Sequence, residues 1–165
     1  MKQEIVTLEP FEIMGLKVRT STKDEFNPAT AKIGPLIQKF WLENIPNKIP
    51  HPKNLNHQIS SYSHYENEDK GAYDYLFGLE VPKNEISPLE LSSLIIQGGS
   101  YVKFTSSPGP MPDIVIQMWQ AIWKMSPAEL GGVRAYKTDF ELYDERTQDA
   151  QHAIVEIYIG IFPNA

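Results

Sequence analysis

The alternation of hydrophobic and polar residues divides the chain into strand-like stretches that are interrupted twice by helix-like periodicity. β-branched and aromatic residues fill the strand-like stretches, while Pro, Gly and Asn mark the turns between them. This pattern predicts strands at about residues 3–8, 11–20, 58–65, 73–81, 91–97, 100–106, 133–143 and 152–161.

The two predicted helices have one apolar face each. Apolar residues at i, i+3, i+4, i+7 and i+8 run from Ile33 to Trp41, and Gly34-Pro35 interrupts this pattern. The helix therefore either opens at Asn27-Pro28 and kinks, or begins at Pro35. The second helix follows Asp113, a suitable N-cap residue.

The order strand, strand, helix, strand, strand occurs twice along the chain. Trp41 aligns with Trp123 and Pro82 with Pro163, a period of about 81–82 residues. The sequence therefore predicts an α+β fold: a single domain, 1–165, built from two ββαββ halves at about 1–82 and 91–163. The strands should be mostly antiparallel, with both helices packed on one side.

The last strand contains one carboxylate within an apolar run. Strand alternation places Glu156 on the face of Tyr158, opposite the face of Val155. A charge in such a position is costly unless it is solvated or paired. Glu156 is therefore either a solvated glutamate opposite Lys137 or Arg134, or a carboxylate that a bound cation neutralises.

Pockets tend to form in the crevice between related halves. Aromatic rings gathered around a carboxylate attract cations, whereas the alternative role for each ring is core packing. The predicted ligand-binding residues are Glu156, Tyr158, Trp119, Trp123, Tyr75, Phe77, Tyr101 and Tyr143.

Composition narrows the range of functions. With 165 residues and a net charge of −6, the chain has no basic run for direct binding to nucleic acid. It has no cysteine and no apolar segment that would span a membrane, which fits a cytoplasmic protein. The scattered histidines and the lack of a glycine-rich phosphate loop predict neither a metal nor a cofactor.

Several stretches together resemble the GyrI-like effector-binding domains. Phe140-Glu141-Leu142-Tyr143, an acidic turn and residues 155–161 resemble the closing hairpin of that family. Residues 98–104 and 71–78 are similar to two more of its strands. Residues 32–41 and 65–68 are closest to its free-standing branch, which includes integron-cassette proteins.

The resemblance implies a ligand cleft between two halves. Drug-sensing members bind bulky lipophilic cations around a buried glutamate and aromatic rings, and that glutamate would correspond to Glu156. The chain differs at Gly160, where many relatives have proline, and at Ile37, where the cassette branch often has tryptophan. Its pocket should therefore have a shape of its own.

The function that follows is a stand-alone small-molecule binding protein for amphipathic, cationic ligands. We expect no DNA-binding segment ahead of the first strand. One alternative is a hydrolase of strained electrophilic molecules, with Glu156 as general base and Tyr158 or Tyr101 as proton donor. Another is a protein-interaction module of the gyrase-inhibitor type, with a protein partner or a second copy of the chain.

Overall fold

The computed structural model describes residues 1–164, and its main elements follow the predicted order. In chain order they are β1 (Lys2–Leu8), β2 (Phe11–Ser21), α1 (Thr22–Glu25), α2 (Ile33–Leu42), η1 (Ile45–Lys48), β3 (Gln58–Ser63), β4 (Ala72–Val81), β5 (Ser92–Ile96), β6 (Gly99–Thr105), α3 (Asp113–Lys124), α4 (Pro127–Leu130), β7 (Gly132–Arg134), β8 (Thr138–Tyr143), η2 (Glu145–Thr147) and β9 (Glu156–Pro163).

The strands pair antiparallel in one sheet with the order β1-β6-β9-β8-β3-β4-β2-β5, and β7 pairs with β9 beside this path. This order is symmetric about the β8–β3 pair. The first strand of each half pairs with the second strand of the other half, β1 with β6 and β5 with β2. The large antiparallel sheet with few helices confirms the predicted α+β class. The division into repeats at residues 82 and 91 stays a prediction, and the symmetric order is what such repeats would produce.

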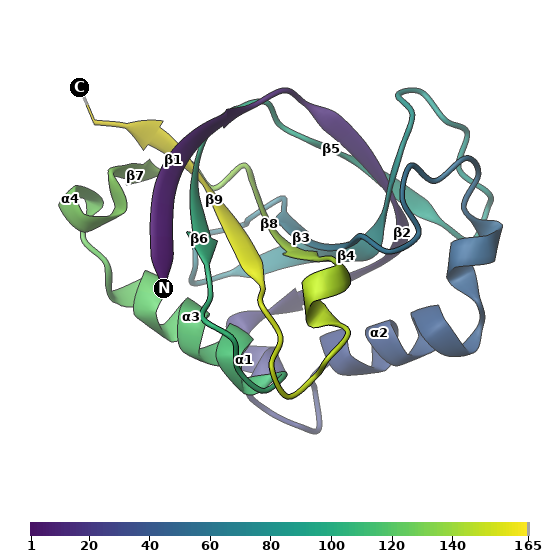
Figure 1. Ribbon diagram of the computed structural model, residues 1–165. Helices are drawn as coiled ribbons and strands as arrows, with labels where there is room; N and C mark the ends of the chain where they lie inside the picture. The colour runs from purple at the N-terminus through teal and green to yellow at the C-terminus, as the bar shows by residue number, and fades with distance from the viewer. Residues whose placement is uncertain (165) are drawn as a thin grey trace.

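The sheet is strongly curled. Figure 1 shows β1 and β2 arching over the side opposite β3 and β8. The enclosed inner face is filled by apolar side chains from most of the strands. At Gly15 a Cβ would lie only 2.0 Å from the carbonyl oxygen of Phe77, so β2 and β4 approach more closely there than a larger residue allows. The buried inner residues are Ile13, Ile59, Leu76, Ile96, Tyr101 and Phe140.

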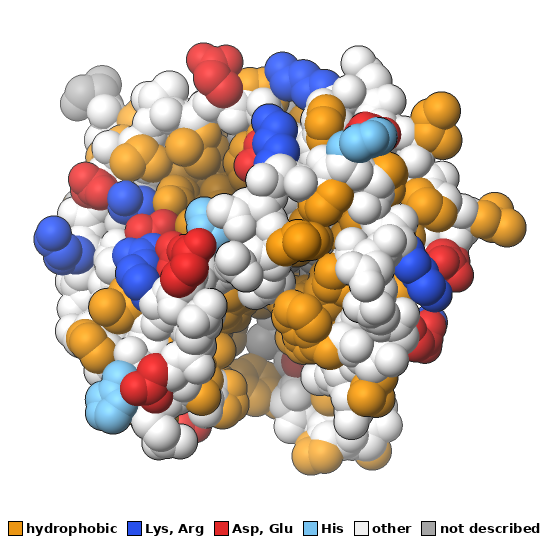
Figure 2. All heavy atoms as spheres, turned by 45° about the vertical axis from the view of Figure 1, so that its right-hand side comes forward, with side chains coloured by type: hydrophobic (Ala, Val, Ile, Leu, Met, Phe, Trp, Pro, Cys, Tyr) orange, Lys and Arg blue, Asp and Glu red, His pale blue; other side chains and the backbone are white. Residues whose placement is uncertain are grey.

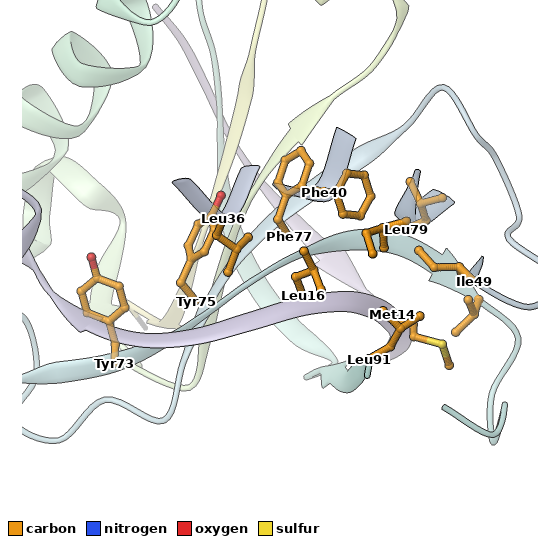
Figure 3. Close-up of a cluster of buried hydrophobic side chains, with 12 residues drawn as sticks. Met14, Leu16, Leu36, Phe40, Ile49, Tyr73, Tyr75, Phe77, Leu79 and Leu91 are labelled. Carbon is orange, nitrogen blue, oxygen red and sulfur yellow. The ribbon is translucent and has the colours of Figure 1, made fainter. Parts of the chain in front are cut away.

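The outer face of the sheet carries the two principal helices. Helix α2 packs its buried Leu36 and Phe40 on β2 and β4, and the rings of Phe40 and Phe77 meet edge to face at 4.8 Å (Figure 3). Helix α3 packs Ile114 and Met118, with Ile122, on β6 and β9. No helix among residues 1–164 is long and apolar enough to cross a membrane.

Helix α2 begins at Ile33, close to the second of the two predicted starts. The carboxylate of Glu25 accepts hydrogen bonds from the backbone N–H groups of Lys32 and Ile33, at 2.9 and 3.1 Å. These donors are otherwise unpaired at a helix N-terminus. Asn27 does not open the helix, because it lies in a turn where its side chain accepts from the N–H of Ala29.

Two predicted strands differ from the structure, one because it is interrupted in the middle and the other because it begins later. The stretch 133–143 is two strands, since Tyr136 has a left-handed φ of 52° that breaks the extended chain between β7 and β8. The stretch 152–161 becomes a strand only at Glu156. Before it, Ala153 pairs with Gly109 in an isolated bridge instead of extending the sheet.

Candidate functional site

A cavity of about 690 Å³ opens on the helix-covered side of the sheet, with lining residues from α2, α3, β3, β4 and β8. Figure 2 shows hydrophobic side chains gathered around a hollow in the lower middle of its view. A volume of this size suits a drug-sized molecule. The aromatic lining comprises Phe26, Trp41, Tyr62, Tyr65, Tyr73, Tyr75, Phe77, Trp119, Trp123 and Tyr143.

Strand and helix periodicity place these rings. Alternate residues of β4 point to the same face, so Tyr73, Tyr75 and Phe77 all reach the helix side. Trp119 and Trp123 are four residues apart on α3 and therefore lie on one side of it, with ring centroids 6.2 Å apart. Trp123 remains 43% exposed, so one edge of the cavity is open to solvent.

A buried carboxylate stands in the wall of this cavity. Glu141 on β8 is 2% exposed and accepts hydrogen bonds from Trp119 Nε1 at 2.6 Å and from the Tyr62 hydroxyl at 2.7 Å. The Tyr143 hydroxyl donates a further, short hydrogen bond to the other carboxylate oxygen. All three donors are neutral, and Glu141 has no basic partner within 4.0 Å in the described part of the chain.

Burial shifts the protonation equilibrium of the Glu141 carboxyl group. It raises the pKa of the carboxyl group because the charged form loses its hydration, while the hydrogen bonds from Tyr143, Trp119 and Tyr62 oppose this shift. Burial, reinforced by the nearby Glu141 charge, also raises the pKa of Tyr62, so this hydroxyl stays protonated and can donate. The result is a desolvated carboxylate held in place without a counter-charge.

A second polar group, centred on Arg134, also lies in the wall of the cavity. Arg134 Nη2 donates to Asp139 at 2.7 Å, and its guanidinium lies 4.3 Å from the centre of the Tyr136 ring. Asp139 is fully buried and also accepts from the Tyr65 hydroxyl at 2.5 Å and from the N–H of Gly160 at 2.8 Å. Arg134 and Tyr65 both line the cavity.

The structure brings together five of the predicted ligand-binding residues. Tyr75, Phe77, Trp119, Trp123 and Tyr143 all line the cavity.

The prediction that Glu156 lies at the centre of the site is corrected, because Glu156 does not line this cavity. It lies on the other face of the sheet, 7% exposed, with Arg146 Nη2 at 3.1 Å and Lys103 Nζ at 3.8 Å. Its other carboxylate oxygen accepts from the Tyr158 hydroxyl at 2.8 Å. The charge is therefore paired within the chain, although by other residues than Lys137 and Arg134.

Tyr158 and Tyr101 also belong to the inner face. The Tyr158 ring stacks on Phe140 with centroids 4.4 Å apart, beside a separate cavity of about 190 Å³. The Tyr101 hydroxyl donates to the carbonyl of Gln97 at 2.6 Å and lies 2.8 Å from Thr138 Oγ1. A hydrolytic centre of Glu156, Tyr158 and Tyr101 would thus have no place in the large cavity.

Sequence reasoning missed Glu141 and its donor Tyr62. The signal was present in strand alternation, because Glu141 and Tyr143 are two residues apart and must share a face. The pairing of Glu141 with Ile157 also places it on the face of the apolar residues of β9. For a metal, residues 1–164 offer no group of three His, Cys, Asp or Glu side chains.

The fold and this cavity define a GyrI-like small-molecule binding domain. Residues 4–161 match the family described as Cass2, integron-associated effector binding protein, and the chain belongs to that family. It is 29% identical over 157 residues to YobU of Bacillus subtilis (strain 168), named as a candidate transcriptional regulator, covering 95% of this chain and 96% of YobU.

Two solved structures show the same fold. The integron cassette protein VCH_CASS2, from the mobile metagenome of Vibrio cholerae, has a TM-score of 0.77 and 32% identity, covering 97% of this chain and 95% of that one. SAV2435, solved bound to tetraphenylphosphonium, has a TM-score of 0.75 and 16% identity, covering 98% and 94%. Membership of an effector-binding family supports small-molecule binding.

Proposed function

We propose that this protein binds amphipathic organic cations in the large cavity, with Glu141 as their counter-charge. The observation that carries this is a carboxylate that is 2% exposed, faces a ligand-sized cavity and has only neutral hydrogen-bond donors. A buried charge without an opposite charge is unfavourable, and a bound cation would remove that cost.

The aromatic wall supports the same ligand class. Ring faces attract a positive charge, and ring surface buries the apolar groups of a lipophilic cation. Tyr62 joins the two features, since it donates to Glu141 and its ring lies 5.3 Å from Trp119 and 5.4 Å from Tyr75. The tetraphenylphosphonium bound to SAV2435, which shares the fold, is a cation of this kind.

Calorimetric titration with tetraphenylphosphonium tests the proposal, with triphenylmethanol as a neutral probe that carries three of the same rings. We expect the cation to bind and to quench the fluorescence of Trp119 and Trp123, and the neutral probe to bind at least about tenfold more weakly. Equal affinity for the two probes, or no binding of the cation, would contradict the proposal.

A further inference from the structure

Arg134 is the one basic side chain among the described residues that line the large cavity. Arg134 is the last residue of β7, and the left-handed φ of Tyr136 separates this strand from β8. The side chain is largely buried, with 14% of its surface exposed. A cavity that otherwise has carboxylates as its charged groups, Glu25, Asp69 and Glu141, thus contains one fixed positive charge.

Most of the hydrogen-bonding capacity of this guanidinium is unused. A guanidinium has five N–H donors, and here only Nη2 makes a hydrogen bond to another described residue. Nε is buried with no partner and has no surface that a ligand could reach. Nη1 is not enclosed in this way and makes no hydrogen bond within residues 1–164, so Nη1 and the second hydrogen of Nη2 are the donors that remain for another molecule.

The surrounding contacts hold Arg134 in place and offer it no further acceptor. Asp139 already accepts from Tyr65, from the Gly160 N–H and from Arg134 itself, and Tyr136 covers the guanidinium face. Burial lowers the pKa of Arg134, but the attraction of Asp139, together with smaller contributions from Tyr65 and Tyr136, outweighs it and the net shift is upward. The charge is therefore permanent, and its spare donors are left for another molecule.

The two polar groups of the cavity are connected through β8. Asp139, which anchors Arg134, and Glu141 are alternate residues on β8, which places their Cα atoms about 7 Å apart on the same face. Tyrosine rings connect the donors of these two groups: the ring centroids of Tyr62 and Tyr73 are 5.5 Å apart, and those of Tyr73 and Tyr65 are 6.0 Å apart.

We propose that the cavity selects two-pole ligands, with a cationic centre beside Glu141 and an acceptor oxygen, best a carboxylate, on the free donors of Arg134. This inference rests on the proposed function and narrows its ligand class from cations to molecules that also carry an acceptor. Arginine donors form their strongest hydrogen bonds with carboxylates, often in pairs. Asp69 also lines the cavity but is solvent-exposed, so water screens its repulsion of such a group.

Two probes of matched size test this inference by calorimetry: (4-carboxyphenyl)triphenylphosphonium and (4-methylphenyl)triphenylphosphonium. For the wild-type protein we expect the carboxylated probe to bind about tenfold more tightly, as for an added charge-assisted hydrogen bond. This comparison uses the wild-type protein alone. Equal affinities, or a preference for the methyl probe, would overturn the inference.

The variant Arg134→Lys keeps a positive charge for Asp139 and removes the forked donors. We expect the ratio of the two affinities to fall to about one, because the shorter reach of an ammonium at this position does not replace the Nη1 and Nη2 donors of the guanidinium. Lys137→Gln is the matched control, since Lys137 is exposed, lies 5.3 Å from the Phe162 ring and does not line the cavity. It should keep the wild-type ratio.

The outcomes separate this inference from the proposed function. If tetraphenylphosphonium does not bind the wild-type protein, the proposed function fails. If it binds but the carboxylated probe has no advantage, only the role of Arg134 fails. An unchanged ratio in Arg134→Lys, with thermal unfolding showing a folded variant, would equally overturn that role.

Discussion

Two glutamates on neighbouring strands, Glu141 on β8 and Glu156 on β9, are both almost fully buried but differ in their partners. Glu156 is held by Arg146 and Lys103, so its charge is balanced within the chain. Glu141 has three neutral donors and a cavity in front of it. The comparison teaches that burial of a carboxylate is not what marks a binding site. What distinguishes Glu141 is burial without an opposite charge at the wall of a cavity.

The largest expected effect is on cation binding by Glu141→Gln. Loss of the charge should weaken tetraphenylphosphonium binding by about 2–5 kcal/mol, as for truncated buried charge pairs. The glutamine oxygen can still accept from Trp119 and Tyr62, so the shape of the cavity is kept. Calorimetry on this variant and on Glu156→Gln is the measurement, and the second variant should change the dissociation constant less than about threefold. If both variants bind like the wild type, the distinction between the two glutamates is lost.

The free energy of unfolding should fall more in Glu156→Gln than in Glu141→Gln, the opposite of the order expected for cation binding. Glu156→Gln breaks charged contacts with Arg146 and Lys103 and should lower the free energy of unfolding by about 1–2 kcal/mol, a value reduced because Arg146 is 38% exposed. Glu141→Gln removes an uncompensated buried charge, so the ligand-free variant should be at least as stable as the wild type at neutral pH. Urea denaturation of both variants checks this, and a larger loss in Glu141→Gln would contradict it.

The two carboxylates should also differ in how binding depends on pH. Because the pKa of Glu141 is raised above its ordinary value of 4.5 by burial, a proton competes with the cation as the pH falls through that raised pKa. Below it, affinity should fall by up to about tenfold per pH unit, or about 1.4 kcal/mol. The measurement is a pH series of tetraphenylphosphonium titrations, and in Glu141→Gln the profile should be flat.

The raised pKa of Glu141 also makes the free energy of unfolding depend on pH. A carboxyl group whose pKa is higher in the folded state binds its proton more tightly there, so its contribution to stability rises as the pH falls through the window between the two pKa values. The difference in unfolding free energy between wild type and Glu141→Gln isolates this contribution from the other acidic groups. A difference that does not vary with pH would show that the pKa of Glu141 is unshifted.

The smallest effect is expected for Trp119→Phe. This change keeps an aromatic wall but removes the 2.6 Å hydrogen bond to Glu141, which should weaken cation binding at neutral pH by about 1 kcal/mol. It should also move the midpoint of the pH profile upward, because one donor that stabilises the charged form is gone. Trp123→Phe is the control, since Trp123 lines the cavity without bonding to Glu141. Equal midpoints in the two variants would count against this role of Trp119.

Much of the fold could be predicted because it is encoded locally. The periodicities gave the principal helices and the approximate strand ranges, and the repeated order gave the α+β class. The interruption between β7 and β8 at Tyr136 could not be predicted, because no sequence pattern marks a tyrosine at positive φ. The contact of this tyrosine ring with Arg134 forms only in the folded chain. The late start of β9 likewise depends on the distant bridge between Ala153 and Gly109.

The candidate site was predictable in kind but not in its central residue. Alternation showed that Glu156 and Val155 occupy opposite faces of the last strand, but not which face the helices cover. That depends on the curl of the whole sheet, which encloses the Tyr158 face and leaves the Glu141 face to α2 and α3. The pairing of Glu156 with Arg146 was also hidden, since η2 returns this arginine to the start of β9 only in three dimensions.

The pairing of β1 with β6 and of β5 with β2 has a consequence for synthesis of the chain. Within residues 1–164, strand β1 pairs with β6 alone, and Lys2 pairs with Thr105. While the chain leaves the ribosome, β1 therefore has no partner and β2 has one open edge until residues 92–105 emerge. Pairing over such separations is slow, and open strand edges invite contacts with other chains. A nascent chain that has emerged from the ribosome only as far as residue 90 should accordingly depend on chaperones far more than one that has emerged beyond residue 105.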